Sequence, residues 1–370
     1  MFGNFSKKNR TTRSVRIVCG LAFVLFCTIF LYFQANLLEM LQKILSEGQT
    51  SYSAKWGTWI ITLILCLIQV GVDALSRLPE RFHALSYFPS LLLLAFLTDV
   101  DKWCYASMSL RHWIWILPLS FCLFAILVGA VRQLNIYLED ERSLKWPARY
   151  LPNLVILNVL CLGCISLSNT DELFHYEAAV DSALLDNDYT KALSVAEKSP
   201  LVSRELSVMR VYALSRVDSL PEKLFVYPYK NGAESLLFMS GEVSSTWLKP
   251  ESVYKYLGDT PYMGETVIHY LQRLCYTEKG NEPALNYYLC ALLLDKKLDL
   301  FVKELNKFCF VELSLPQAYK EALYLYYKQH SLLTPPFDMT ELEQKYDLYS
   351  LSSLKEKNNY WFYYDHVGVN

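Results

Sequence analysis

Asp99 and Asp101, separated by a single valine, are the strongest candidates for chemistry in this sequence. Arg111 and His112 stand at the other end of the loop that begins there. Two carboxylates near a histidine can act as a general base or hold a divalent cation. The competing interpretation, which we favour, is that acidic residues collect wherever an apolar helix meets water.

The acidic pair defines an alternative function, which is a membrane enzyme that acts on a lipid-linked sugar. Such an enzyme would be similar to the membrane glycosyltransferases, with Asp99, Asp101 and His112 at the outer membrane surface. Those enzymes have many more spans, however, and their acidic pair usually lies in the first outer loop. The sequence therefore leaves catalysis open and favours a role without it.

The sequence has one further motif with metal or redox spacing, Cys161-Leu-Gly-Cys164, and because it lies in an apolar stretch we interpret it as helix packing. The six histidines are scattered, no two lie four residues apart, and there is neither a glycine-rich phosphate loop nor a Gly-x-Ser-x-Gly elbow. We therefore predict no metal site and no cofactor. Asp73, near the end of an apolar stretch, has Arg77 four residues on, which permits an ion pair along one helix.

Aromatic residues are dense at the end of the chain, in Tyr360-Trp361-Phe362-Tyr363-Tyr364. The simpler interpretation is that these rings cap the last helices and fill a core. The alternative is a binding surface for a glycan or peptide, formed by Tyr360, Trp361, Tyr363 and Tyr364, because tyrosine offers a rigid apolar body with a polar tip.

Five apolar stretches are long enough to cross a bilayer, which takes about 20 residues. The third is the shortest and contains Pro89, so it could be re-entrant, although a short tilted span is favoured. We therefore predict a membrane domain over residues 1–168, in which the lipid bilayer is the first partner. The predicted spans are residues 17–34, 57–76, 84–100, 113–131 and 150–168.

The loops between these spans differ in charge, which predicts their orientation. Those on the N-terminal side of the membrane hold 11 Lys and Arg, and those on the opposite side hold 4. We therefore expect a multi-pass protein of the inner (cytoplasmic) membrane, with a cytoplasmic N-terminus and residues 169–370 in the periplasm. That second half has 28 acidic and 20 basic residues, which leaves 9 and 15 for the first. The bases of the first half are scattered between apolar runs, so we expect no nucleic-acid partner.

Helical periodicity replaces the long apolar runs after Asn169. Polar breaks at residues 186–188 and 217–219 separate predicted helices. Ala213-Leu214 followed by Leu220 has a counterpart in Ala291-Leu292 followed by Leu298. The rhythm is typical of tetratricopeptide-like arrays, although the repeat signature is absent. The sequence thus predicts an all-α protein, in which a transmembrane bundle precedes an α-solenoid over residues 169–370.

Three cysteines of this second half bear on its redox state. Cys290 and Cys309 lie on neighbouring predicted helices and could form a disulfide. Together with Cys275, however, we expect them to be reduced and buried, as small apolar side chains.

Several phrases of the second half carry a family resemblance: the Asp171-Glu-Leu start, Lys191-Ala-Leu-Ser-Val-Ala-Glu-Lys-Ser-Pro200, Lys223-Leu-Phe-Val-Tyr-Pro228 and the aromatic tail. In these the chain resembles an uncharacterised family of bacterial integral membrane proteins with a tetratricopeptide-like C-terminal region. The resemblance implies this architecture and a bacterial inner-membrane setting, and it assigns no site.

The function that these features favour is a membrane-anchored scaffold of the cell envelope. Stacked helix pairs leave a concave surface that binds proteins or peptides and needs no chemistry of its own. We therefore expect a protein or peptide partner on the outward side of the membrane.

Overall fold

The chain is helical in all the regular elements of the residues that the structure describes, which confirms the all-α prediction. The structure is a computed structural model, and it divides into two compact units, Met1–His175 and Tyr176–Asn370. It describes residues 12–101, 112–134, 146–240, 248–277, 279–308, 315–330, 338–351 and 358–368.

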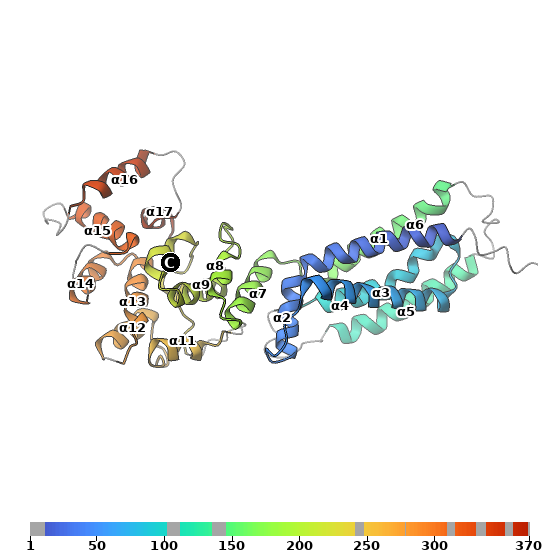
Figure 1. Ribbon diagram of the computed structural model, residues 1–370, viewed down its shortest axis with the longest axis horizontal. Helices are drawn as coiled ribbons and strands as arrows, with labels where there is room; N and C mark the ends of the chain where they lie inside the picture. Colours follow the sequence, from blue (N-terminus) through green and yellow to red (C-terminus); the bar gives the residue numbers. More distant parts are fainter. Residues whose placement is uncertain are drawn as a thin grey trace, which may run out of the picture. The chain divides into compact units, whose positions relative to one another are not determined.

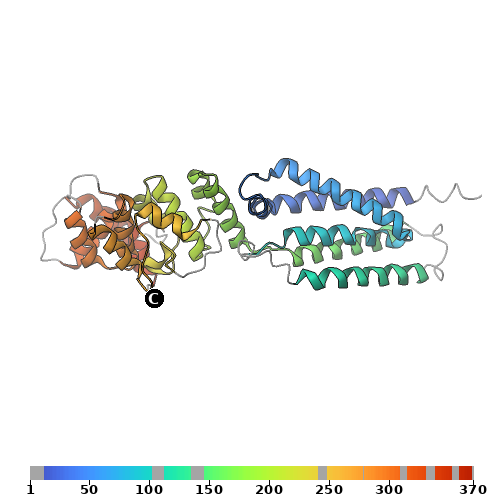
Figure 2. The ribbon, with the colours of Figure 1, turned by 90° about the horizontal axis from the view of Figure 1, so that it is seen from below.

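The first unit is a bundle with five helices that are long and apolar enough to cross a membrane. They lie side by side (Figures 1 and 2), and their bounds agree with the five predicted spans to within five residues at every end. The helices of the bundle are α1 (Thr12–Phe33), α2 (Ala35–Leu45), α3 (Ala54–Ser76), η1 (Glu80–Tyr87), α4 (Phe88–Thr98), α5 (Trp113–Leu134) and α6 (Trp146–Leu167).

The surface of the bundle is apolar, and polar side chains turn inward. Thr58, Thr62 and Gln69 of α3 are buried. This distribution reverses that of a helix in water and is the one expected where lipid surrounds the helices. Leucines that are more than half exposed on the outside include Leu21, Leu25, Leu63, Leu67 and Leu119.

The third predicted span consists of two helical segments in direct succession. The 3-10 helix η1 leads into α4 at Phe88, and Pro89 occupies the first turn of α4, where its missing N–H costs no hydrogen bond. Together they form one run from Glu80 to Thr98 that is long enough to span. It is the most buried of the five, because α4 packs against α3, α5 and α6.

The second unit is built of shorter helices, several of which follow one another side by side (Figure 1). Its elements are α7 (Glu172–Leu185), α8 (Tyr189–Ser194), α9 (Arg204–Arg216), α10 (Leu220–Lys223), η4 (Leu224–Val226), η5 (Gly232–Ser235), α11 (Pro250–Leu257), α12 (Val267–Tyr276), α13 (Pro283–Leu294), α14 (Leu298–Phe308), α15 (Gln317–Gln329), α16 (Thr340–Leu351) and α17 (Tyr360–His366).

Among the described residues of this unit, one type of turn occurs three times, after α7, α9 and α13. In each turn one residue, Asn187, Asp218 or Lys296, adopts the left-handed conformation with φ between 52° and 57°. The next residue donates its N–H to a carbonyl five positions back, which satisfies an otherwise unpaired group at the helix end. These bonds, each 2.9 Å long, run from Asp188 N to Ala183 O, from Ser219 N to Leu214 O and from Lys297 N to Leu292 O.

The three turns correspond to features of the sequence. The predicted breaks at 186–188 and 217–219 both coincide with turns, and the predicted similarity between the ends of α9 and α13 is present in the backbone. The turn after α7 belongs to the same set, which the sequence comparison did not reveal. The set therefore includes three helix pairs, α7 with α8, α9 with α10 and α13 with α14, at uneven intervals along the chain.

Helix α13 forms the centre of this unit. It is apolar on all sides, and its residues from Tyr287 to Leu294 are all buried. A helix of 12 residues is too short to cross a bilayer, so its all-round apolar surface marks a core helix. Helices α10, α11, α12 and α14 pack around it.

Candidate functional site

The carboxylate of Asp99 accepts two hydrogen bonds on one oxygen at the end of the bundle. His112 Nε2 lies 2.6 Å from Asp99 Oδ2, and Trp113 Nε1 donates to the same oxygen at 2.7 Å. Asp99 terminates α4, whereas His112 and Trp113 stand at the start of α5. The structure thus brings together two of the three residues that the sequence proposed for catalysis.

Hydrogen bonds to the end of α6 fix the segment that carries Asp99. Asn169 donates its backbone N–H to Thr98 O at 3.1 Å and its side-chain amide to Val100 O at 2.7 Å. The Thr98 and Ser168 hydroxyls lie 2.8 Å apart. Asp101, the third predicted residue, is half-buried at the end of the described segment, and Arg111 lies outside the described residues.

The Asp99–His112 pair can perform one kind of chemistry, which is proton transfer. A carboxylate that holds one imidazole nitrogen orients the ring, which leaves the other nitrogen for proton transfer. The His112 side chain is 54% exposed, so its other nitrogen is accessible to a substrate or water. Among the described residues, no three His, Cys, Asp or Glu side chains come close enough together to hold a metal ion.

A second polar cluster lies inside the bundle, at the end of α3. Asp73 Oδ1 lies 3.0 Å from His83 Nδ1, and Asp73 Oδ2 lies 3.2 Å from an Arg16 nitrogen. The proposed ion pair with Arg77 is therefore replaced by two partners from other helices. The spacing of Asp73 and Arg77 suits an ion pair along one helix. Arg77, however, follows the last turn of α3 in a left-handed conformation. The pair therefore lacks the helical geometry that it requires.

Asn153 of α6 binds the backbone of η1, the helix that carries His83. The Asn153 side chain accepts from Ala84 N and donates to Glu80 O, both at 2.8 Å. His83 is 5% exposed, and its Nε2 has no hydrogen-bond partner among the described residues. These polar groups hold η1 against α6, so their geometry supports a structural role. Sequence reasoning missed His83 and Asn153, whose only signal was a polar side chain in or beside an apolar span.

The aromatic tail forms α17, and most of its rings are buried. Tyr360, Trp361 and Tyr363 are less than 5% exposed, and Tyr364 is half-buried. Trp361 Nε1 donates to Glu321 O at 3.0 Å, and Tyr363 Oη donates to Leu294 O at 2.8 Å. These contacts attach the tail to α15 and α13. The burial favours the packing interpretation over a binding surface made of all four residues.

A cavity of about 440 Å³ nevertheless lies beside this tail, within the second unit. Three segments far apart in the sequence form it: the loop after α8, the residues around η4, and α17. Tyrosine, phenylalanine and proline side chains dominate its walls. The lining residues are Glu197, Lys198, Ser199, Pro200, Phe225, Val226, Tyr227, Pro228, Tyr229, Asn358, Phe362, Tyr363 and Val367.

Tyr229, one of the residues that line the cavity, carries a buried hydroxyl group. It is 2% exposed, and its hydroxyl has no hydrogen-bond partner among the described residues. Burial raises the pKa of this hydroxyl, so it is neutral and can still donate. An unpaired buried hydroxyl costs about 1–3 kcal/mol.

Arg210 of α9 supports the wall from behind. It is 1% exposed, its guanidinium lies 4.7 Å from the Tyr227 ring centre, and Nη2 donates to Val195 O and Ala196 O at 3.1 Å. Burial lowers the pKa of this arginine. A cation on the carbonyls at the end of α8 fixes the loop that forms one wall of the cavity.

The described cysteines of this unit are unpaired thiols, and Cys290 is buried as predicted, whereas Cys275 is only half-buried. Cys290 is fully buried on α13, where burial raises the pKa of its thiol to about 12. A thiol in this state is unreactive. Cys309, the proposed disulfide partner, lies outside the described residues.

Comparisons with known proteins return no match: no protein-family model, curated protein or solved structure matches the chain.

Proposed function

We propose that the chain is a membrane-anchored scaffold of the cell envelope, and that its helical-repeat domain binds a protein or peptide partner. The five apolar helices would cross the inner (cytoplasmic) membrane, with the N-terminus in the cytoplasm and residues 169–370 in the periplasm. The charge difference between the loops supports this orientation. The family resemblance of the sequence agrees with the same architecture.

The observation that carries the binding role is the cavity beside α17. Its walls combine aromatic rings with prolines. Rigid aromatic pockets with few polar groups are typical anchoring points for a side chain or turn of a peptide. A volume of about 440 Å³ accommodates a few side chains, so the pocket suits a short anchor within a larger contact.

Site-specific photo-crosslinking in intact cells tests this role. A photoreactive phenylalanine analogue at Phe362, a half-buried residue of the cavity wall, should give one discrete adduct with a partner protein. The matched control is the same analogue at Leu348, which is 70% exposed on α16 and outside the cavity. That position should give no such adduct.

A second substitution connects the adduct with the cavity. Ser199 lines the cavity and is half-buried, so Ser199→Phe should fill part of the space and remove the adduct formed at position 362. If the adduct persists unchanged in the filled variant, or if none forms in cells that contain normal amounts of protein, the cavity is not the docking point.

The second candidate function is the membrane enzyme that acts on a lipid-linked sugar. The 2.6 Å contact between Asp99 and His112 favours it, because such a pair can transfer a proton. Replacing Asp99 and Asp101 together by Asn discriminates between the two functions. A phenotype equal to full deletion at normal protein level would support the enzyme, and full complementation would support the scaffold.

A further inference from the structure

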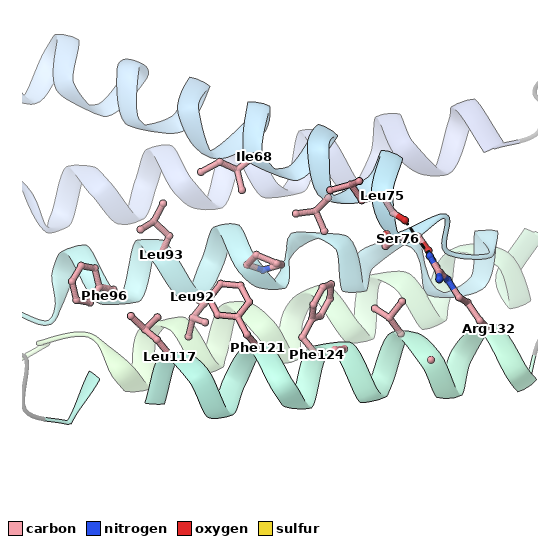
Figure 3. Close-up of a pocket in the computed structure, with 15 residues that line it drawn as sticks. Ile68, Leu75, Ser76, Leu92, Leu93, Phe96, Leu117, Phe121, Phe124 and Arg132 are labelled. Carbon is pink, nitrogen blue, oxygen red and sulfur yellow. Dashed lines mark hydrogen bonds between the residues drawn. The ribbon is translucent and has the colours of Figure 1, made fainter. Parts of the chain in front are cut away.

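A groove of about 760 Å³ runs between α3, α4 and α5 of the bundle (Figure 3). Figure 3 shows Phe96 and Leu117 at one end, with Ser76 and Arg132 at the other. Along α5, 15 residues separate Leu117 from Arg132, which corresponds to about 22 Å at the rise of an α-helix. The groove is therefore long and narrow, and it follows the direction of the helices.

The walls of the groove are hydrocarbon along most of this length. Leucine and phenylalanine side chains from the three helices line it, and Gly129 leaves open space at its wall. Phe121 is half exposed, so the groove opens onto the apolar outer surface of the bundle. Its occupant in a membrane must match an apolar wall and enter from the side, which are the properties of an acyl chain.

Arg132 gives one end of the groove a positive charge. Its Nε donates to Ser76 O at 2.9 Å, and its Nη2 donates to Leu75 O at 3.1 Å and also to Ser76 O. These carbonyls terminate α3, where a cation is favoured. Nη1 has no hydrogen-bond acceptor, and the guanidinium has no carboxylate partner, among the described residues. The arginine is thus fixed in place, and its Nη1 group is the part that can donate to a ligand.

We propose that this groove binds an anionic phospholipid, with one acyl chain along α3, α4 and α5 and the phosphate on the Nη1 group of Arg132. The proposal rests on the membrane placement given under Proposed function. A guanidinium N–H donates a charge-assisted hydrogen bond to a phosphate oxygen. A basic group at the end of an apolar inter-helix groove is a site for lipid head groups, and Arg77, exposed next to Ser76, adds a second positive charge nearby.

The opposite end of the groove does not suit an anionic head group. Phe96 packs edge-on against Trp113, with ring centres 5.3 Å apart, and Trp113 donates to the Asp99 carboxylate. A phosphate there would meet a negative charge and two apolar rings. The charge distribution therefore orients the lipid with its head group at Arg132.

Native mass spectrometry of the full chain in detergent tests the proposal. Phosphatidylglycerol and phosphatidylcholine with identical acyl chains are titrated separately. We expect one tightly held phosphatidylglycerol with roughly tenfold preference over phosphatidylcholine, as one charge-assisted contact provides. Arg132→Gln should reduce the preference to less than about twofold, and Arg132→Lys, which keeps the charge but loses the Nε and Nη2 bonds to α3, should retain only part of it.

A glycine substitution tests the apolar part of the groove independently. Gly129→Leu fills the groove and should weaken binding of both lipids roughly tenfold. The matched control is Gly163→Leu on α6, where a side chain also meets open space but lies outside the groove. It should bind both lipids as the unmodified chain does.

Several outcomes would overturn the proposal. They are equal affinity of the unmodified chain for both lipids, a full preference in Arg132→Gln, or unchanged binding in Gly129→Leu. Washing membranes with alkaline carbonate separates this failure from failure of the membrane placement. A protein that the wash releases refutes both, whereas a retained protein without lipid preference refutes the groove alone.

Discussion

His83 Nδ1 and Asp73 Oδ1 lie 3.0 Å apart inside the bundle, and this contact joins η1 to the end of α3. Arg16 of α1 reaches the other oxygen of the same carboxylate. One acidic residue thus connects three segments of the bundle. Such a group is costly to bury alone and is stabilised by its partners, so its removal affects more than a single contact.

We expect Asp73→Ala to lower the free energy of unfolding by about 2 kcal/mol, because His83 Nδ1 would lose this acceptor in a buried position. Unfolding in mild detergent, followed by tryptophan fluorescence, measures the change. Arg77→Gln is the matched control, since Arg77 is exposed and outside the cluster, and it should change stability by less than about 0.5 kcal/mol. Equal losses in the two variants would contradict the assignment of partners.

The left-handed turn after α9 provides a second prediction. Asp218 is exposed with φ of 52°, a conformation that glycine adopts without steric cost. Asp218→Gly should therefore raise the free energy of unfolding by about 0.5–1 kcal/mol. Lys303→Gly, at an exposed position within α14, is the control and should lower it by about 1 kcal/mol. A loss of stability in both variants would show that the Asp218 side chain contributes more than its backbone strain costs.

The sequence predicts those features that depend on local pattern. Five long apolar runs define five helices, and Asp99 and His112 fall at the two ends of one loop, where the structure joins them. It does not predict the partners of Asp73, because His83 and Arg16 reach it only through the packing of separate helices.

Two other features stay hidden in the sequence for related reasons. The turn at Asn187 belongs with those at Asp218 and Lys296 by its backbone conformation, while the three residue types differ. The cavity next to Tyr229 combines segments that lie more than 130 residues apart. No spacing rule connects them, so only the folded chain reveals the cavity.

Glu321 of α15 should make stability depend on pH. Burial raises the pKa of this carboxyl, although its oxygens accept hydrogen bonds from Tyr360 N and Gln317. A folded-state pKa above the unfolded value means that the folded chain binds more protons, so this contribution to stability is full at low pH. It is lost as pH rises from the ordinary glutamate value, about 4.3, through the folded pKa.

The variant Glu321→Gln isolates this effect, because glutamine does not titrate. The stability of the unmodified chain minus that of the variant should fall as pH increases through this window. Denaturant unfolding of the full chain in detergent at several pH values measures the difference. A difference that is constant with pH, or that grows as pH rises, would contradict the direction of the pKa shift.

The orientation of the chain gives the last prediction. Loops on one side of the predicted spans hold 11 basic residues against 4 on the other, and basic loops stay in the cytoplasm. Alkaline phosphatase, which is active only outside the cytoplasm, should therefore be active when fused after Asn370. A fusion after Arg77, in a loop on the cytoplasmic side, should be inactive. An inactive but well-expressed fusion at Asn370, together with an active one at Arg77, would reverse the orientation and place the cavity beside α17 in the cytoplasm.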